Sequence, residues 1–194
     1  MSRFLVTGAS GYIGSKLVEK LLYYDHSVFL LLRSTAKIKV EHKNIEAIII
    51  PAKPDDLINA IPKYIDAVFH LASAMNTGPN GEDLDETIST NIRLPVLLLQ
   101  AMRKQGIKQL INIGSYWQAT SHDKQVANTI YAASKTALEA FVDYYAQYHN
   151  ISAISLRLPD VYGEDDIRPK LLPSLLSTQT GGVFNLTEGE QSIY

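Results

Sequence analysis

The chain has 194 residues, 46% of them apolar and 20% charged, which suits one globular domain with a sizeable core, or one domain and part of another. The net charge is −2 and there is no basic block, so we expect no nucleic-acid partner. Cysteine is absent, which excludes disulfides, thiolate metal sites and a cysteine nucleophile. The sequence has no signal-peptide pattern and no apolar run near the ~20 residues of a membrane span, so we expect a cytoplasmic protein without a membrane partner.

A glycine-rich segment follows the first predicted strand, Phe4-Leu5-Val6. Its sequence is Thr7-Gly8-Ala9-Ser10-Gly11-Tyr12-Ile13-Gly14. The residues after it have apolar side chains three and four apart through Leu22, which predicts a helix lying on a sheet. A strand, a glycine loop and a helix in this order present free N–H groups and the positive end of a helix dipole to a phosphate.

Each glycine of this segment has an expected task. Gly8 allows a tight turn, Gly11 lets a pyrophosphate approach the backbone, and Gly14 lets the helix pack closely on the strand. A plain structural turn is the alternative, because glycine strings are common. The strand-to-helix context favours a dinucleotide site made of Gly8, Ser10, Gly11, Tyr12, Ile13 and Gly14.

The second predicted strand is the apolar run 27–32, and Arg33 follows it. An acidic residue at this place would bind the ribose hydroxyls of NAD, whereas an arginine can hold the 2′-phosphate of NADP. Arg33 therefore favours NADP, with NAD as the alternative cofactor.

The elements that follow alternate between strands and helices. We expect a loop at 35–44, a strand at 45–50, a short helix at 55–61, a strand at 67–72, a loop at 76–82, a helix at 82–105 that Pro95 kinks or breaks and Gly106 ends, a strand at 109–113, a loop at 118–129, a helix at 131–149 and a strand at 152–158. This alternation predicts an α/β protein with a doubly wound parallel sheet, the Rossmann arrangement.

From Pro159 onward the alternation stops, and prolines and glycines become frequent. We therefore predict a dinucleotide-binding domain at 1–160. Residues 161–194 are expected to be the start of a smaller substrate domain that is incomplete in this chain.

Candidate catalytic residues stand where ligands of such a sheet bind, beyond the carboxyl ends of the strands. Ser115 closes the strand at 109–113, while Tyr131 and Lys135 lie four apart at the start of the next helix, on one face. A free phenol has a pKa near 10, which is too high for proton transfer at neutral pH. An ammonium about 4 Å away would favour the phenolate by about 4 kcal/mol at an effective dielectric constant near 20. With 11 tyrosines a chance pair is expected, and Tyr12 with Lys16 looks like one.

Several of these segments carry a family resemblance together. They are the glycine loop, His70-Leu71-Ala72, Asn91, Ser115, Tyr131 with Lys135, Arg157-Leu158-Pro159-Asp160-Val161-Tyr162-Gly163 and Gly189-Glu190-Gln191. In these motifs the chain resembles the extended short-chain dehydrogenase/reductase family, in its NAD-dependent epimerase/dehydratase group that acts on nucleotide sugars. The resemblance covers nearly the whole chain. The tail is most similar to reductases that make CDP-linked dideoxysugars.

The resemblance implies a role for each matching residue. Tyr131 would be the acid/base, Lys135 would make it a usable proton donor and bind the nicotinamide ribose, and Ser115 would orient the substrate. Asn91 would be structural. Leu71, Ala72 and Leu158 would join the cofactor site. The resemblance also implies a homodimer formed by the long helix and the Tyr131 helix.

The chain departs from the family at two of its motifs. Pro51-Ala52-Lys53 stands where the family usually has an aspartate that touches adenine, and Gln118-Ala119-Thr120 replaces a common Val-Tyr-Gly. No metal site is predicted, and His70 is expected to be a packed strand-end histidine, because no second ligand-type residue stands at ligand spacing.

Three functions are consistent with these residues. The first is an NADP(H)-dependent reductase of a nucleotide-linked 4-keto sugar. The second is a 4-epimerase that retains NAD, and the third is an NAD(P)-binding scaffold or regulator without catalysis.

Overall fold

The computed structural model describes residues 1–34, 42–53, 56–75, 81–118, 127, 129–166, 168 and 174–175, except for the side chains of 81–83. The chain divides into two compact units, Met1–Arg157 and Leu158–Tyr194. Gly189-Glu190-Gln191 and most of the loops predicted at 35–44, 76–82 and 118–129 lie outside the described residues.

Six strands form one sheet in the order β3-β2-β1-β4-β5-β6. They are β1 (Arg3–Thr7), β2 (Ser27–Leu32), β3 (Ile45–Ile49), β4 (Ala67–His70), β5 (Gln109–Ser115) and β6 (Ser152–Leu158). The pairings of β1 with β2 and β4, of β2 with β3, and of β4 with β5 are all parallel. The predicted doubly wound parallel sheet is confirmed.

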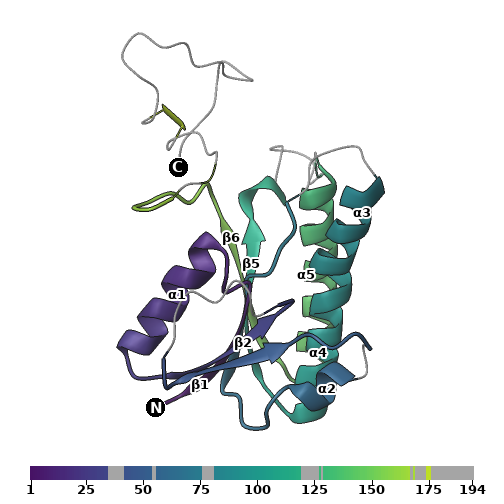
Figure 1. The fold of residues 1–194 in the computed structure, drawn as a ribbon. Helices are drawn as coiled ribbons and strands as arrows, with labels where there is room; N and C mark the ends of the chain where they lie inside the picture. The colour runs from purple at the N-terminus through teal and green to yellow at the C-terminus, as the bar shows by residue number, and fades with distance from the viewer. Residues whose placement is uncertain are drawn as a thin grey trace. The chain divides into compact units, whose positions relative to one another are not determined.

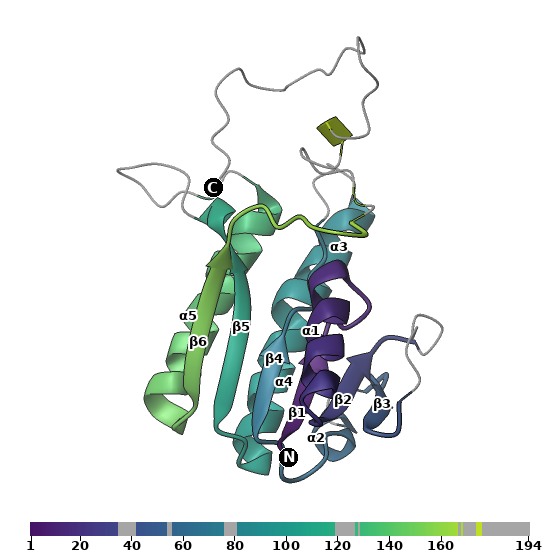
Figure 2. The same cartoon turned by 90° about the vertical axis from the view of Figure 1, so that its left-hand side faces the viewer.

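Helices cover both faces of the sheet (Figure 1). The described ones are α1 (Tyr12–Tyr23), α2 (Asp56–Ala60), α3 (Gly81–Ile88), α4 (Leu94–Gln105) and α5 (Ile130–His149). Helix α1 lies on one face, and α2, α4 and α5 lie on the other, as the turned view also shows (Figure 2). The strand order reverses its direction between β1 and β4, and ligands of such sheets bind beyond the carboxyl ends of the strands at this place.

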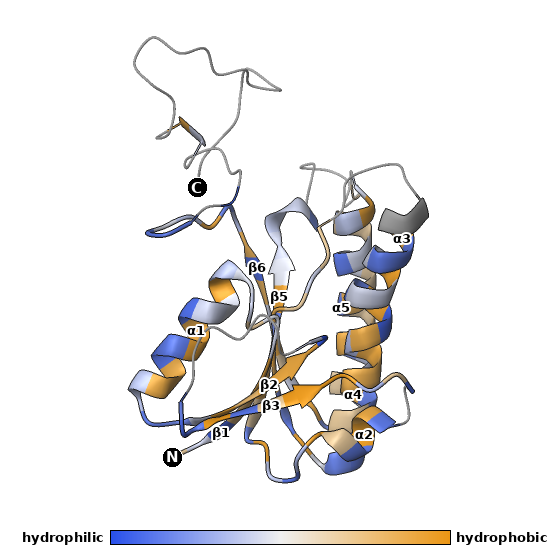
Figure 3. Cartoon of the chain, viewed as in Figure 1, coloured by the Kyte–Doolittle hydropathy of each residue, from blue (hydrophilic) through white to orange (hydrophobic). Residues whose placement is uncertain are grey.

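Two apolar clusters make the core, one on each face of the sheet. The larger cluster joins the sheet to α4 and α5 through residues such as Leu99, Met102 and Leu138, and the smaller one joins it to α1 through Val18 and Leu21. Strands β2 and β3 and the inner side of α4 are accordingly hydrophobic in Figure 3. Burial of each such side chain contributes about 1.5–3 kcal/mol to the stability of the fold.

The predicted long helix at 82–105 is interrupted, as expected, just before Pro95. Its two parts, α3 and α4, are joined by a π-helical turn at Ser89–Arg93, and Pro95 lies in the first turn of α4. Proline has no N–H to donate to the carbonyl group four residues earlier, so the hydrogen-bond ladder shifts there. Gly106, with φ of +74°, ends α4 in the left-handed conformation.

The strand predicted at 67–72 is shorter than expected and ends at His70. The N–H groups of Leu71 and Ala72 donate to the hydroxyl of Thr7 at 3.2 and 3.1 Å. The N–H of Leu71 also donates to the carbonyl group of Thr7 at 3.2 Å, so the backbone ladder ends there and a side chain takes the donor of Ala72. The other predicted helix and strand bounds differ from the observed ones by two residues or fewer.

Candidate active site

The glycine loop joins β1 to α1 in a tight turn. Gly8 has φ of +73°, and a Cβ on it would lie 2.5 Å from the amide nitrogen of Ala72. A Cβ on Gly14 would overlap the carbonyl group of Gly8, whereas one on Gly11 would meet only the oxygen of Gly8, at 3.3 Å. Packing within the chain therefore requires Gly8 and Gly14, while Gly11 borders open space where a ligand can approach.

The start of α1 fits an anion such as a pyrophosphate. Gly11 is the residue before the helix, and no side chain among the described residues caps the first turn. Uncapped N–H groups and the helix dipole together favour a bound phosphate. Of the other predicted loop residues, Ser10 is exposed, and Tyr12 and Ile13 are half-buried.

Thr7 connects the end of β1 to the end of β4. Its hydroxyl accepts the N–H groups of Leu71 and Ala72 and lies 2.8 Å from Nδ1 of His70. Leu71 also donates to the carbonyl group of Thr7 at 3.2 Å, so Thr7 binds this segment through both its backbone and its side chain. Burial, and then the charge of Lys135, lower the pKa of His70 to about 3, which keeps this imidazole neutral. His70 is thus the packed histidine that the sequence predicts.

Asn91 holds the segment after β4 from the other side. It is fully buried in the π-helical turn. Its Oδ1 accepts the N–H of Ala74 at 2.7 Å, and its Nδ2 donates to the carbonyl group of Ala74 at 2.8 Å and to the hydroxyl of Ser134 at 3.0 Å. The segment 71–74 is therefore fixed between the glycine loop and α5.

Ser115 lies at the carboxyl end of β5, half-buried. Its Oγ accepts the N–H of Trp117 at 3.2 Å, and its own N–H donates to Oε1 of Gln118 at 2.7 Å. The turn at Tyr116–Gln118 thus fixes the serine while leaving its hydroxyl proton to point toward a substrate.

Tyr131 and Lys135 lie in the first two turns of α5, which Thr129 caps by accepting the N–H of Ala132 at 3.0 Å. The Tyr131 ring meets the Trp117 ring edge to face, with centroids 6.2 Å apart. The Nζ of Lys135 lies 6.0 Å from the Tyr131 ring centroid and donates to the carbonyl group of Ile113 on β5 at 2.9 Å. The structure therefore brings α5 and the end of β5 together at these residues.

Lys135 is 3% exposed, and burial lowers its pKa to about 8. About nine-tenths of the molecules then carry the ammonium at pH 7. After the bond to Ile113, two ammonium protons remain for a phenol, a ribose hydroxyl or a water.

The remaining predicted cofactor residues are more dispersed. Arg33 follows β2 and forms an ion pair with Glu86 of α3, with Nη1 and Oε1 2.8 Å apart. Leu71 and Ala72 lie against Gly8. Leu158 ends β6 and begins the second unit.

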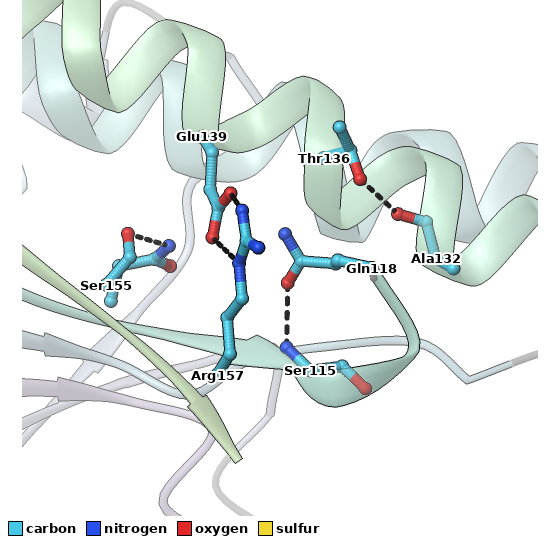
Figure 4. Close-up of polar contacts among 8 residues, drawn as sticks. Ser115, Gln118, Ala132, Thr136, Glu139, Ser155 and Arg157 are labelled. Carbon is cyan, nitrogen blue, oxygen red and sulfur yellow. Dashed lines mark hydrogen bonds and ion pairs between the residues drawn. The ribbon is translucent and has the colours of Figure 1, made fainter. Parts of the chain in front are cut away.

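A polar network beside Ser115 was not predicted from the sequence (Figure 4). Gln118, which is 2% exposed, supports the serine, and Arg157 on β6 binds both oxygens of Glu139 on α5. Burial alone would raise the pKa of Glu139, but the hydrogen bonds and charge of Arg157 lower it overall. The spacing of these residues in the sequence does not predict the network, because the fold brings them together from separate elements.

Within the described ranges, no group of three histidine, aspartate or glutamate side chains could hold a metal ion. No described helix combines the length and apolar character needed to cross a membrane.

Nearly the whole chain matches a known protein family. The family described as "NAD dependent epimerase/dehydratase family" matches residues 4–191. The chain belongs to this family. The predicted family membership is confirmed.

Two similar proteins of known function carry the names of nucleotide-linked sugars. The chain is 28% identical to CDP-abequose synthase of Yersinia pseudotuberculosis, over 98% of this chain and 67% of that protein. It is also 28% identical to UDP-glucose 4-epimerase of Mycolicibacterium smegmatis, over 83% of this chain and 56% of that protein. The chain therefore spans about three fifths of the length of these relatives.

Solved structures of the family share the fold. UDP-glucose 4-epimerase of Thermus thermophilus in complex with NAD has a TM-score of 0.69 at 24% identity, over 84% of this chain and 58% of that one. MoeE5 in complex with UDP-glucuronic acid and NAD has a TM-score of 0.73 at 25% identity, over 90% of this chain and 60% of that one.

Neutral, buried His70 should make the fold sensitive to acid. Its pKa is about 3 in the folded chain and near 6.5 in the unfolded chain, so between these values the unfolded chain binds more protons. The stability that neutral His70 adds to the fold is fully present above about pH 6.5 and is lost as the pH falls. We expect the free energy of unfolding, measured with urea, to fall by about 2 kcal/mol between about pH 7 and pH 5 because of His70. The variant His70→Asn should lack this fall.

The control is His42→Asn, which removes an exposed imidazole and should keep the full pH dependence. NMR of the unaltered protein gives a second measurement, in which the His70 ring should stay neutral between pH 7 and pH 5. A His70 resonance that titrates near pH 6.5 would contradict the assignment.

Proposed function

We propose that this chain carries the cofactor site and the acid–base residues of an NAD(P)-dependent oxidoreductase that reduces a 4-keto group on a nucleotide-linked sugar. The observation that supports it most is that the start of α5 packs beside the end of β5, where Ser115 lies. Lys135 bonds to the carbonyl group of Ile113, and the Tyr131 ring contacts that of Trp117. A glycine loop that fits a pyrophosphate and relatives named for CDP- and UDP-linked sugars support it further.

Reduction of a ketone needs a hydride on carbon and a proton on oxygen. When bound, the nicotinamide would supply the hydride. In our proposal Tyr131 donates the proton, and the Lys135 ammonium stabilises the negative charge that the phenol oxygen then carries. Ser115 donates a hydrogen bond to the same substrate oxygen, which orients the carbonyl group. Lys135 would also hold the nicotinamide ribose.

A 4-epimerase that retains NAD is the second candidate, supported by the UDP-glucose 4-epimerases among the relatives. Protein purified with tightly bound NAD would favour it over the reductase. A catalytically inert NAD(P)-binding scaffold or regulator is the third, and turnover of any nucleotide sugar would exclude it.

The second unit has a role in this proposal as the start of the substrate domain, from 161 onward. Within it, Asp166 binds Arg168 at 2.7 Å, and Arg168 also donates to the carbonyl group of Val161 at 2.8 Å. A cytoplasmic location remains a prediction from the sequence.

Tyr131→Phe tests the mechanism. Without the phenol proton we expect turnover to fall at least about 100-fold, the usual range for a lost general acid, with cofactor affinity nearly unchanged. The substrate comes first from a mass-spectrometric screen of nucleotide sugars with NADH and NADPH. Tyr23→Phe, on the exposed face of α1, is the control and should keep full activity. Unchanged turnover in Tyr131→Phe would remove the shared mechanism of reductase and epimerase.

Arg33 leads us to propose NADP(H) as the preferred cofactor. Paired calorimetric titrations should show tighter binding of NADPH than of NADH. Arg33→Ala should weaken NADPH binding about 10-fold or more, because a charge-assisted hydrogen bond is lost, and should leave NADH binding nearly unchanged. Tighter binding of NADH by the unaltered protein would contradict the preference.

We also propose a homodimer through the outward faces of α3 and α5. Apolar side chains at helical spacing are exposed there, at 40–65% of their surface, and such stripes favour burial against a partner. They are Leu84, Ile88, Ile130, Phe141, Tyr144 and Tyr148.

A charge in this stripe should separate the protomers. Sedimentation velocity should find a dimer for the unaltered protein and a monomer for Phe141→Glu, because dimer formation would bury an unpaired carboxylate. Tyr23→Glu places the same charge on α1 and should remain a dimer. A monomeric unaltered protein at micromolar concentration would rule the dimer out.

A further inference from the structure

The ion pair between Arg33 and Glu86 links two parts of the chain that are far apart in sequence. Arg33 follows β2, while Glu86 lies in α3, after β4. Their side chains are 69% and 45% exposed, so solvent and small ligands reach both. The guanidinium of Arg33 is therefore already engaged by a carboxylate.

A guanidinium binds a carboxylate and a phosphate through the same fork of N–H donors. When Nη1 of Arg33 serves Glu86, it is not available to a phosphate in the same geometry. The exposed pair is weak, equivalent to at most about a fivefold change in an equilibrium constant, so a doubly charged phosphate can displace the carboxylate. Displacement then leaves two anions, the carboxylate and the phosphate, near one cation.

We propose that Glu86 is a specificity-determining residue, which competes with the 2′-phosphate of NADP(H) for Arg33 and so limits the preference for NADPH over NADH. This inference rests on the proposed function, in which Arg33 faces the adenosine ribose. NADH has a neutral 2′-hydroxyl at that place and gains little from Arg33, so Glu86 affects its binding little.

The test uses calorimetric titrations of NADPH and NADH with Glu86→Gln and a matched control. Asp85→Asn removes the same charge from the neighbouring exposed position of α3. We expect Glu86→Gln to tighten NADPH binding about three- to tenfold and to change NADH binding less than about twofold. Asp85→Asn should change the NADPH/NADH ratio less than about twofold.

The double variant Arg33→Ala/Glu86→Gln separates competition from a general charge effect. Compared with Arg33→Ala alone, it should gain clearly less NADPH affinity than Glu86→Gln gains over the unaltered protein, because only the repulsion between the two anions is then removed. Three results would each overturn the role of Glu86 while leaving the cofactor site in place. They are an equal gain in NADPH affinity in the Arg33→Ala background, an equal gain in Asp85→Asn, and a lower preference for NADPH over NADH in Glu86→Gln. Failure of the unaltered protein to bind either cofactor would instead remove the proposed function, and this inference with it.

Discussion

The hydroxyl of Thr7 is the contact on which the ligand-facing edge of the sheet depends. It accepts the N–H of Ala72, shares that of Leu71 with the carbonyl group of Thr7, and lies 2.8 Å from Nδ1 of His70. The backbone of Leu71 and Ala72 lies so close to Gly8 that even a methyl group could not fit on this glycine. One side chain therefore links the end of β1 to the residues that pack against the glycine loop.

Charge is distributed unevenly around this edge. Lys135 is a buried cation held by a carbonyl group, and after burial its charge is the second cause that lowers the pKa of His70. The pair of Arg157 and Glu139 is neutral as a unit and lies beside the support of Ser115. Among these described groups of the candidate site, Lys135 thus adds positive charge and the ion pair adds none, which suits a reaction that places negative charge on an oxygen.

Short-range patterns could be predicted from the sequence, and contacts between distant segments could not. Tyr131 and Lys135 are four apart on a helix, so their common face follows from helical geometry alone. The link between Thr7 and His70 depends on the register of β1 with β4, over 63 residues. The partner of Arg33 is 53 residues away on α3, and no periodicity indicates it.

Side-chain hydrogen bonds also changed where some predicted elements end. Pro95 correctly indicated a break in the long helix, but the form of the break depended on the burial of Asn91, whose bonds hold a wider turn in place. The strand end at His70 was missed because the N–H of Ala72 leaves the ladder for the side chain of Thr7, and no turn residue marks this place in the sequence. Family membership was predictable because features such as the glycine loop and the pair of Tyr131 and Lys135 are short motifs at a strand end or a helix start.

The π-helical turn has a consequence for how the chain tolerates changes in length. Each residue of an α-helix rotates the following part by about 100°, and the wider turn absorbs one residue more than an α-helical turn would. Deleting a single residue at Ser89–Arg93 would therefore convert the turn to α-helix and leave Glu86 and Leu84 facing nearly the same way relative to α4. The same deletion inside α4 would instead turn α3 by about 100°, so the π-helical turn is the place in this long helix where a change of one residue leaves the outer surface of α3 in place.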